Sequence, residues 1–168
     1  MTYINPGKQF EKAIEDSCKK QKIFFDRKKD VYIPPEYRTK IPVVKNKFDC
    51  LIYLKPYNLP VELKSTAQKS LSFDEKIIKS HQIKGLLEAE QYDGVIPGFL
   101  INFRKYENKT FFLHINDFIN YKDNTNKKSL PLSYCEEKGF EINNQIKIKY
   151  YFYDIEEAIN EITKVYDK

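Results

Sequence analysis

Two strand-like runs, at residues 48–54 and 59–66, constrain the fold of this chain more than any other feature. Both runs are rich in apolar residues, which is typical of strands with a buried face. The four residues between them read Lys-Pro-Tyr-Asn, and this composition indicates a turn. Strands joined by so short a connection pair antiparallel, because a parallel pair needs a crossover of about a dozen residues or more. The sequence therefore predicts an antiparallel hairpin.

Helical patterns stand on both sides of this hairpin. Asn5 as N-cap and Pro6 at the first helical position predict a helix to about residue 20. A second helix fits residues 73–92 or 80–92, a short one capped by Asn116 fits 117–121, and Asp154 opens the last. Further strands are predicted at residues 23–25, 95–103, 110–115 and 147–153, and residues 122–138 as loop. This order predicts an α/β fold, one domain over residues 1–168 with a mixed central sheet flanked by helices.

The composition narrows the class of protein. No run of about 18 apolar residues could form a membrane helix, and the first ten residues lack a signal-peptide pattern, so we expect a cytoplasmic protein without a membrane partner. Cys18, Cys50 and Cys135 are far apart and form no C-x-x-C pair. They are expected to be reduced and mostly buried rather than to bind zinc.

Basic residues gather in one part of the chain. Residues 19–47 carry ten Lys or Arg and three Asp or Glu, a local net charge of +7 in a chain whose total is +5. Within this part, residues 30–47, here called the stalk segment, contain Pro34, Pro35 and Pro42, which disfavour helix and favour extended backbone. We expect the segment to project and to bind a polyanion such as DNA, the alternative being a solvated loop.

The hairpin also carries the candidate chemistry. Alternation along the second strand places Glu62 and Lys64 on one face, with Leu63 on the other. The turn brings Asp49, at the start of the first strand, opposite Glu62 or within one pairing step of it. Two carboxylates that close repel each other unless a hard cation lies between them. The pattern favours a Mg²⁺ site for phosphodiester hydrolysis, with Lys64 assisting.

A plainer interpretation remains open. Acid-x-Lys triplets also occur at residues 74–76 and 136–138, and the pair Glu62 and Lys64 could be an ordinary ion pair on a strand. The surroundings separate the triplets, because only the one at Glu62 lies in an apolar strand with a second acid across a tight turn. His81 is left outside the site, and His114, in an alternating strand, is expected to be structural.

Several stretches resemble a known family. Asp49 followed by Glu62-Leu63-Lys64 resembles the active-site signature of the PD-D/E-x-K nuclease superfamily. The chain resembles more closely the RecU-type Holliday junction resolvases of low-GC Gram-positive bacteria and their phages. The stretches that carry this resemblance are residues 7–11 (GKQFE), Ser72-Phe73, His81-Gln82-Ile83, Asp93-Gly94-Val95 and Phe111-Phe112-Leu113.

The resemblance implies a restriction-endonuclease-like fold with a projecting stalk between the first two strands. It implies a homodimer that cuts four-way DNA junctions by paired nicks with Mg²⁺, or Mn²⁺ as a substitute. By position, Asp49, Glu62 and the Leu63 carbonyl correspond to metal ligands, and Lys64 to the catalytic lysine. Glu11 corresponds to an outer carboxylate of the site, and Gln82 to a residue that orients water or the lysine.

From the stalk segment, four basic residues are the candidate DNA contacts: Arg38, Lys40, Lys45 and Lys47. The hypothesis from the whole sequence is therefore a junction-resolving endonuclease in the cytoplasm of a bacterium or phage-infected cell. Two alternatives stay open: a repair or restriction-like endonuclease of the same fold, and a non-catalytic DNA-binding module whose carboxylates only stabilise the hairpin.

Overall fold

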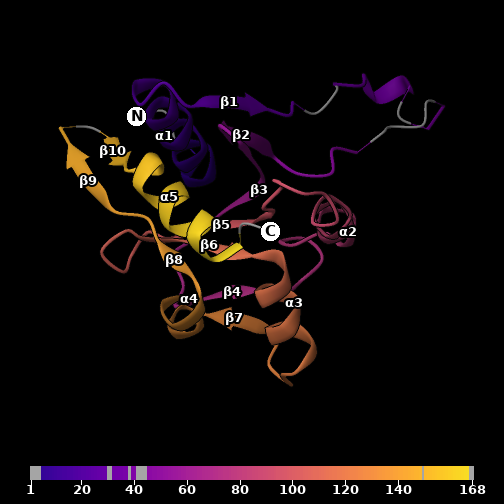
Figure 1. The fold of residues 1–168 in the computed structure, drawn as a ribbon. Coiled ribbons are helices and arrows are strands. Elements are labelled where there is room, and N and C mark those ends of the chain that lie inside the picture. The colour runs from indigo at the N-terminus through magenta and orange to yellow at the C-terminus, as the bar shows by residue number, and fades with distance from the viewer. Residues whose placement is uncertain (1–4, 30–31, 38, 41–44, 149, 167–168) are drawn as a thin grey trace.

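A six-stranded sheet in the order β1-β2-β3-β5-β6-β8 forms the centre of the computed structural model, which describes residues 5–29, 32–37, 39–40, 45–148 and 150–166 (Figure 1). The pairing of β3 with β5 is parallel and the others are antiparallel, so the sheet is mixed, as the sequence predicts. The strands of this sheet are β1 (Phe24–Arg27), β2 (Cys50–Leu54), β3 (Tyr57–Thr66), β5 (Gly98–Phe103), β6 (Lys109–His114) and β8 (Phe140–Glu141).

Helices cover both faces of the sheet because the side chains of its central strands alternate. Val61 and Leu63 of β3 lie in the hydrophobic core beneath α1 and α5, and Phe99 and Ile101 of β5 lie in a second core beneath α2, α3 and α4. The helices are α1 (Pro6–Lys20), α2 (Ser80–Ala89), α3 (Ile115–Asp123), α4 (Leu132–Lys138) and α5 (Ile155–Tyr166). None of the helices in the described ranges is long and apolar enough to cross a membrane.

Two local predictions are confirmed. Helix α1 begins at Pro6, and the Asn5 side chain caps it by accepting a hydrogen bond from the Gly7 N–H at 2.8 Å. The hairpin forms from β2 and β3, with a shorter turn than the four residues expected. Strand β3 begins at Tyr57, directly after Lys55 and Pro56, and the peptide bond between these two residues is cis.

Other predictions were wrong. Residues 122–138 are not loop throughout, because β7 (Ser129–Pro131) pairs with β4 (Ser70–Ser72) and α4 follows it. The strand expected at residues 147–153 is a separate hairpin of β9 (Asn144–Lys147) and β10 (Tyr150–Tyr153), outside the central sheet. Helix α3 is capped by His114 rather than Asn116, because the His114 ring nitrogen accepts the Asn116 N–H at 3.2 Å.

The stalk segment leaves the body between β1 and β2. Its described part includes a short 3₁₀ helix, η1 (Pro35–Tyr37), which lies away from the sheet and its helices (Figure 1). The expectation of purely extended backbone was therefore wrong here, because a proline at the first position of a turn already has a suitable φ angle. Pro42 lies outside the described residues.

Candidate active site

The register of the hairpin brings Asp49 to Glu62. Cys50 of β2 pairs with Val61 of β3, so Asp49, one step before the strand, faces Glu62, one step further along β3. The Asp49 carboxylate is fixed there because its Oδ2 accepts a hydrogen bond from the Leu63 N–H at 3.0 Å. Two acidic side chains thus meet at the point where β2 begins, beside the middle of β3.

Glu62 is fully buried, with 0% of its surface exposed. Its Oε1 accepts hydrogen bonds from Lys64 Nζ at 2.8 Å and from Gln82 Nε2, whereas its buried Oε2 has no hydrogen-bond partner among the described residues. Burial raises the pKa of Glu62 to about 8, with the Asp49 carboxylate adding to the rise and the Lys64 ammonium opposing it. The site therefore holds a carboxylate that lacks the positive charge needed to compensate its burial.

The donor set at this point suits a hard divalent cation. The N–H of Leu63 points toward Asp49, and in a strand the N–H and C=O of one residue point to the same side, so the Leu63 carbonyl lies on that side as well. Two carboxylates and a carbonyl match Mg²⁺, which takes one or two carboxylates and keeps several waters. Within the described ranges, no three His, Cys, Asp or Glu side chains form a group able to hold a metal.

Glu11 lies beside these groups on α1. It forms an ion pair with Arg27 of β1. Burial raises the pKa of Glu11, Arg27 opposes the rise, and Asp49 adds to it; Lys8 and Lys64 exert smaller lowering effects. Glu11 is therefore held by Arg27 near enough to Asp49 and Lys64 for both to act on its charge.

Helix α2 supports the site from the other face of the sheet. The Gln82 side chain donates from Nε2 to Glu62, and its Oε1 accepts the Lys79 N–H at 3.0 Å, closing the first turn of the helix. One turn later, a Cβ at Gly85 would lie 2.5 Å from Lys47 Cβ and 2.7 Å from the Lys47 carbonyl oxygen. The missing side chain at Gly85 therefore lets the chain that leads into Asp49 pack directly on α2.

The basic residues predicted to contact DNA from the stalk segment differ in their surroundings. Lys40 and Lys45 are exposed, whereas Lys47 Nζ pairs with both oxygens of Glu88 at 2.7 Å. In this arrangement Lys47 anchors the segment to α2 rather than extending into solvent. Arg38 lies outside the described residues.

The structure thus brings together Asp49, Glu62, Leu63, Lys64 and Gln82, with Glu11 at the edge; their roles stay predictions. Sequence reasoning missed Arg27 and Gly85. A lone arginine in a short strand carries no signal of its partner. A glycine inside a helix is a signal, since it costs about 1 kcal/mol relative to alanine and often marks a close packing contact.

Comparisons with known proteins show the family and the fold of the chain. The chain is 46% identical to the SPbeta prophage-derived uncharacterized protein YotM of Bacillus subtilis (strain 168), over 95% of this chain and 88% of the relative. Its fold resembles that of Hjc from Archaeoglobus fulgidus, a Holliday junction resolvase from an archaeal hyperthermophile, with a TM-score of 0.53 at 14% identity over 80% of this chain and 95% of Hjc. The family model of RecU, Recombination protein U, matches residues 45–158. The chain therefore belongs to the RecU family, as its motifs indicated.

Proposed function

We propose that this protein is a Mg²⁺-dependent endonuclease that resolves four-way DNA junctions, acting as a homodimer in the bacterial cytoplasm. Family membership and the fold shared with Hjc support a nuclease that acts on branched DNA. The observation that carries the proposal is the buried Glu62 carboxylate opposite Asp49: its Oε1 accepts from the Lys64 ammonium, and its Oε2 has no hydrogen-bond partner within the described residues. An ordinary ion pair on a strand needs neither the complete burial nor the second acid.

Asp49, Glu62 and the Leu63 carbonyl would hold the metal, and Mn²⁺ has the same ligand preference. When bound, such an ion polarises a phosphate oxygen and lowers the pKa of a water. Side chains of the protein would stabilise the transition state and orient the ligands. Lys64, held at 2.8 Å from Glu62, offers positive charge where a pentacoordinate phosphate gains negative charge. Gln82 keeps the Glu62 carboxylate in one orientation.

The residues proposed to hold DNA are the exposed Lys40 and Lys45, together with Arg38. Their charges would contact phosphates rather than bases, so they fix position and carry no sequence preference. Lys47 contributes if its ion pair with Glu88 opens, which costs little because both side chains are more than half exposed.

A labelled four-way junction incubated with Mg²⁺ tests the proposal. We expect nicks at symmetric positions on two opposing strands, little cutting of a linear duplex of the same sequence, and no cutting when the metal is chelated. Sedimentation should give about twice the 20.1 kDa of one chain. Equal cutting of duplex and junction would support a repair or restriction-like nuclease instead. Inertness of a folded sample on both substrates would overturn the proposal.

Gly85→Ala should impair the proposed reaction by displacing Asp49, without removing any group of the site. The added methyl group meets backbone atoms of Lys47, which have no free rotation to avoid it, so the chain before Asp49 must shift. A displacement of about 1 Å at a catalytic group can cost about 10²-fold in rate. We expect kcat to fall about 10- to 100-fold and the Mg²⁺ concentration needed for half-maximal rate to rise.

The matched control for this substitution is Glu88→Ala, on the same helix, which breaks only the exposed ion pair with Lys47. It should leave the rate within about twofold, since such pairs contribute at most about 1 kcal/mol. A Gly85→Ala protein with the wild-type rate and metal dependence would show that the contact with Lys47 does not set the position of Asp49.

A further inference from the structure

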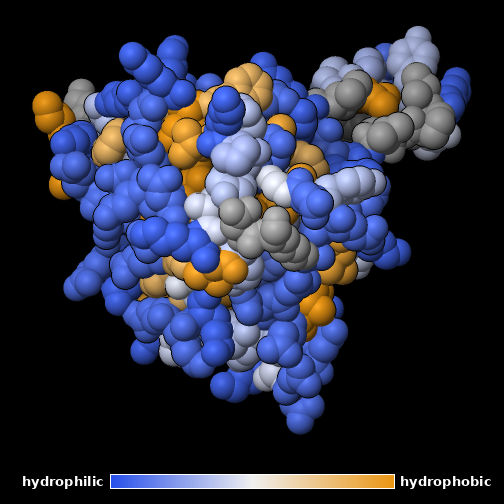
Figure 2. Space-filling view, in the orientation of Figure 1, coloured by the Kyte–Doolittle hydropathy of each residue, from blue (hydrophilic) through white to orange (hydrophobic). Residues whose placement is uncertain are grey.

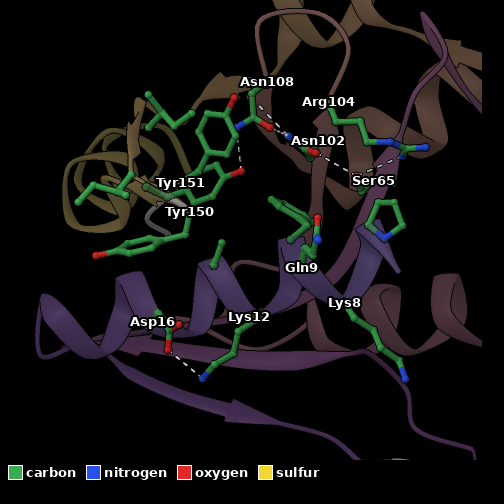
Figure 3. A pocket seen from close by; sticks show the side chains of 16 residues that line it. Lys8, Gln9, Lys12, Asp16, Ser65, Asn102, Arg104, Asn108, Tyr150 and Tyr151 are labelled. Atoms are coloured by element: carbon green, nitrogen blue, oxygen red, sulfur yellow. Dashed lines mark hydrogen bonds and ion pairs between the residues drawn. The ribbon is translucent and has the colours of Figure 1, made fainter. Parts of the chain in front are cut away.

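A cavity with a volume of about 560 Å³ lies on the α1 side of the sheet (Figure 3). Its walls are the first turns of α1, the ends of β3 and β5, and the β9–β10 hairpin. Hydrophobic residues also reach the surface beside α1 and at the tip of this hairpin, on a face that is otherwise mostly hydrophilic (Figure 2). The volume lies within the range of small-ligand sites, about 300 to 1,000 Å³.

The floor of the cavity is a closed polar network. Asn102 accepts a hydrogen bond from Ser65 Oγ at 2.9 Å and donates to Asn108 Oδ1 at 2.8 Å. Asn108 in turn donates to the Tyr153 hydroxyl at 3.0 Å. Asn102, Asn108 and Tyr153 are at most 5% exposed. Their groups satisfy one another, so the floor is rigid and needs no ligand to hold its shape.

Two side chains above the floor have hydrogen-bonding groups that the described residues leave unused. The exposed Gln9 side chain points from α1 into the cavity and has no hydrogen-bond partner among the described residues (Figure 3). The guanidinium of the exposed Arg104 donates one long hydrogen bond, 3.5 Å, to Ser65 Oγ, leaving its other N–H groups for a ligand. Tyr151 stands across the cavity from Arg104 (Figure 3), whereas the neighbouring Tyr150 is engaged by Lys20, whose Nζ donates to its hydroxyl and lies 4.4 Å from its ring centroid.

The cavity adjoins the candidate active site. Ser65 directly follows Lys64 on β3, and Gln9 lies two residues before Glu11 on α1. Side chains alternate along β3, so Ser65 faces the cavity on the α1 side, whereas Lys64 and Glu62 lie on the face that α2 covers.

We propose that this cavity, here called the nucleotide pocket, receives one unpaired nucleotide of the branched DNA that the candidate active site cuts. The inference rests on the proposed nuclease function and deepens it. The Gln9 amide, which can donate and accept, suits a base edge, the Tyr151 ring suits a base face, and Arg104 suits a phosphate. A paired base stays within its stack, so only a base displaced from the duplex enters such a pocket. Displacing a base costs less where the stack is interrupted, as at the branch point of a junction, and this couples cutting to branched DNA.

Binding without cleavage tests the pocket independently of the nuclease. Fluorescence anisotropy in EDTA would follow a labelled single-stranded oligonucleotide and a blunt duplex of matched sequence. We expect Gln9→Ala and Tyr151→Leu each to weaken binding of the single strand about tenfold while duplex binding stays within twofold, because leucine keeps the apolar packing of residue 151 and removes its aromatic face. The matched controls are Lys105→Ala and Tyr92→Leu, at exposed residues that do not line the cavity.

Cleavage then tests the position of the pocket. With Mg²⁺, the same two pocket variants should cut a junction about tenfold more slowly, with the Mg²⁺ dependence of the wild type. If wild type cuts junctions and the variants bind and cut as wild type does, the pocket proposal fails and the nuclease stands. If wild type cuts nothing, the nuclease fails, and the binding experiment still decides whether the cavity takes a nucleotide. A change in sedimentation of the variants, with unchanged single-strand binding, would assign the cavity to contact between two chains and overturn the proposal.

Discussion

Glu62→Gln is expected to abolish Mg²⁺-dependent cleavage and, at the same time, to stabilise the metal-free protein. Glutamine keeps the shape and the acceptor oxygen that Lys64 and Gln82 contact, but it brings no negative charge for a cation. We expect the cleavage rate to fall at least about 10³-fold, equivalent to about 4 kcal/mol of transition-state stabilisation. A gain of stability from the same substitution would separate loss of function from loss of fold.

The stability gain should depend on pH in a defined direction. The pKa of Glu62 is raised from 4.5 to about 8 in the folded protein, so between these values the folded state holds a proton that the unfolded state has lost. Wild type therefore loses stability as pH rises through this window, by up to about 1.4 kcal/mol per pH unit from this group. Glutamine does not titrate, so its advantage should be small near pH 4.5 and grow until about pH 8.

Urea unfolding in EDTA at several pH values measures this difference directly. The control is Glu88→Gln on α2, whose carboxylate is more than half exposed and should show no such trend. Adding Mg²⁺ at pH 8 should stabilise wild type and leave the glutamine variant unchanged, because binding to the folded state alone raises stability. A variant that is less stable than wild type at pH 8 would contradict the view that Glu62 is an uncompensated buried charge.

The sequence predicted the elements with strong local signals. Helix α1 begins at Pro6 because Asn5 and Pro6 together act within a single turn, and the last helix is capped by Asp154 Oδ1, which accepts the Glu157 N–H at 3.1 Å. The β2–β3 hairpin follows from two apolar runs and a short connection. In each case the information lies within a few residues, so tertiary contacts reinforce the local preference without having to overcome it.

The missed elements depend on distant partners. Strand β7 is three residues long and exists because Leu130 pairs with Leu71 of β4, far earlier in the chain. The β9–β10 hairpin was expected as one strand because its turn carries no Gly, Asn-Gly or Pro signal: residues 145–150 read QIKIKY. Short apolar runs of this kind fit several structures, and only packing decides among them.

In the candidate site, too, some features follow from local sequence and others depend on distant contacts. The approach of Asp49 to Glu62 follows from hairpin register and could be inferred from residue spacing. The ion pair of Glu11 with Arg27 and the contact of Gly85 with Lys47 join elements far apart in the chain, and nothing local specifies them. The position of Glu11 and Gln82 beside the hairpin came from resemblance to a family rather than from the residues themselves.

Asp49→Ala is expected to separate cutting from binding. The substitution removes one of the two carboxylates at the site, and we expect junction cleavage to fall at least about 10³-fold, by about 4 kcal/mol in transition-state stabilisation. Junction binding in EDTA should stay within about threefold of wild type or become tighter, because a negative charge facing the phosphates is lost while Lys40 and Lys45 are unchanged. Gel-shift and cleavage assays on the same protein sample measure both quantities.

Asp49→Asn controls for the structural part of this effect. Asparagine can still accept the Leu63 N–H, which Asp49 Oδ2 accepts at 3.0 Å, so the hairpin edge keeps its hydrogen bond while the charge is lost. If Ala and Asn variants lose cleavage alike and Asp93→Ala, an exposed carboxylate elsewhere, does not, the charge at residue 49 is what the reaction needs. If instead the Asn variant cuts as wild type does, the role of Asp49 is to hold Leu63 in place. The metal would then have to be bound by Glu62 without it, which a single buried carboxylate beside a lysine is poorly suited to do.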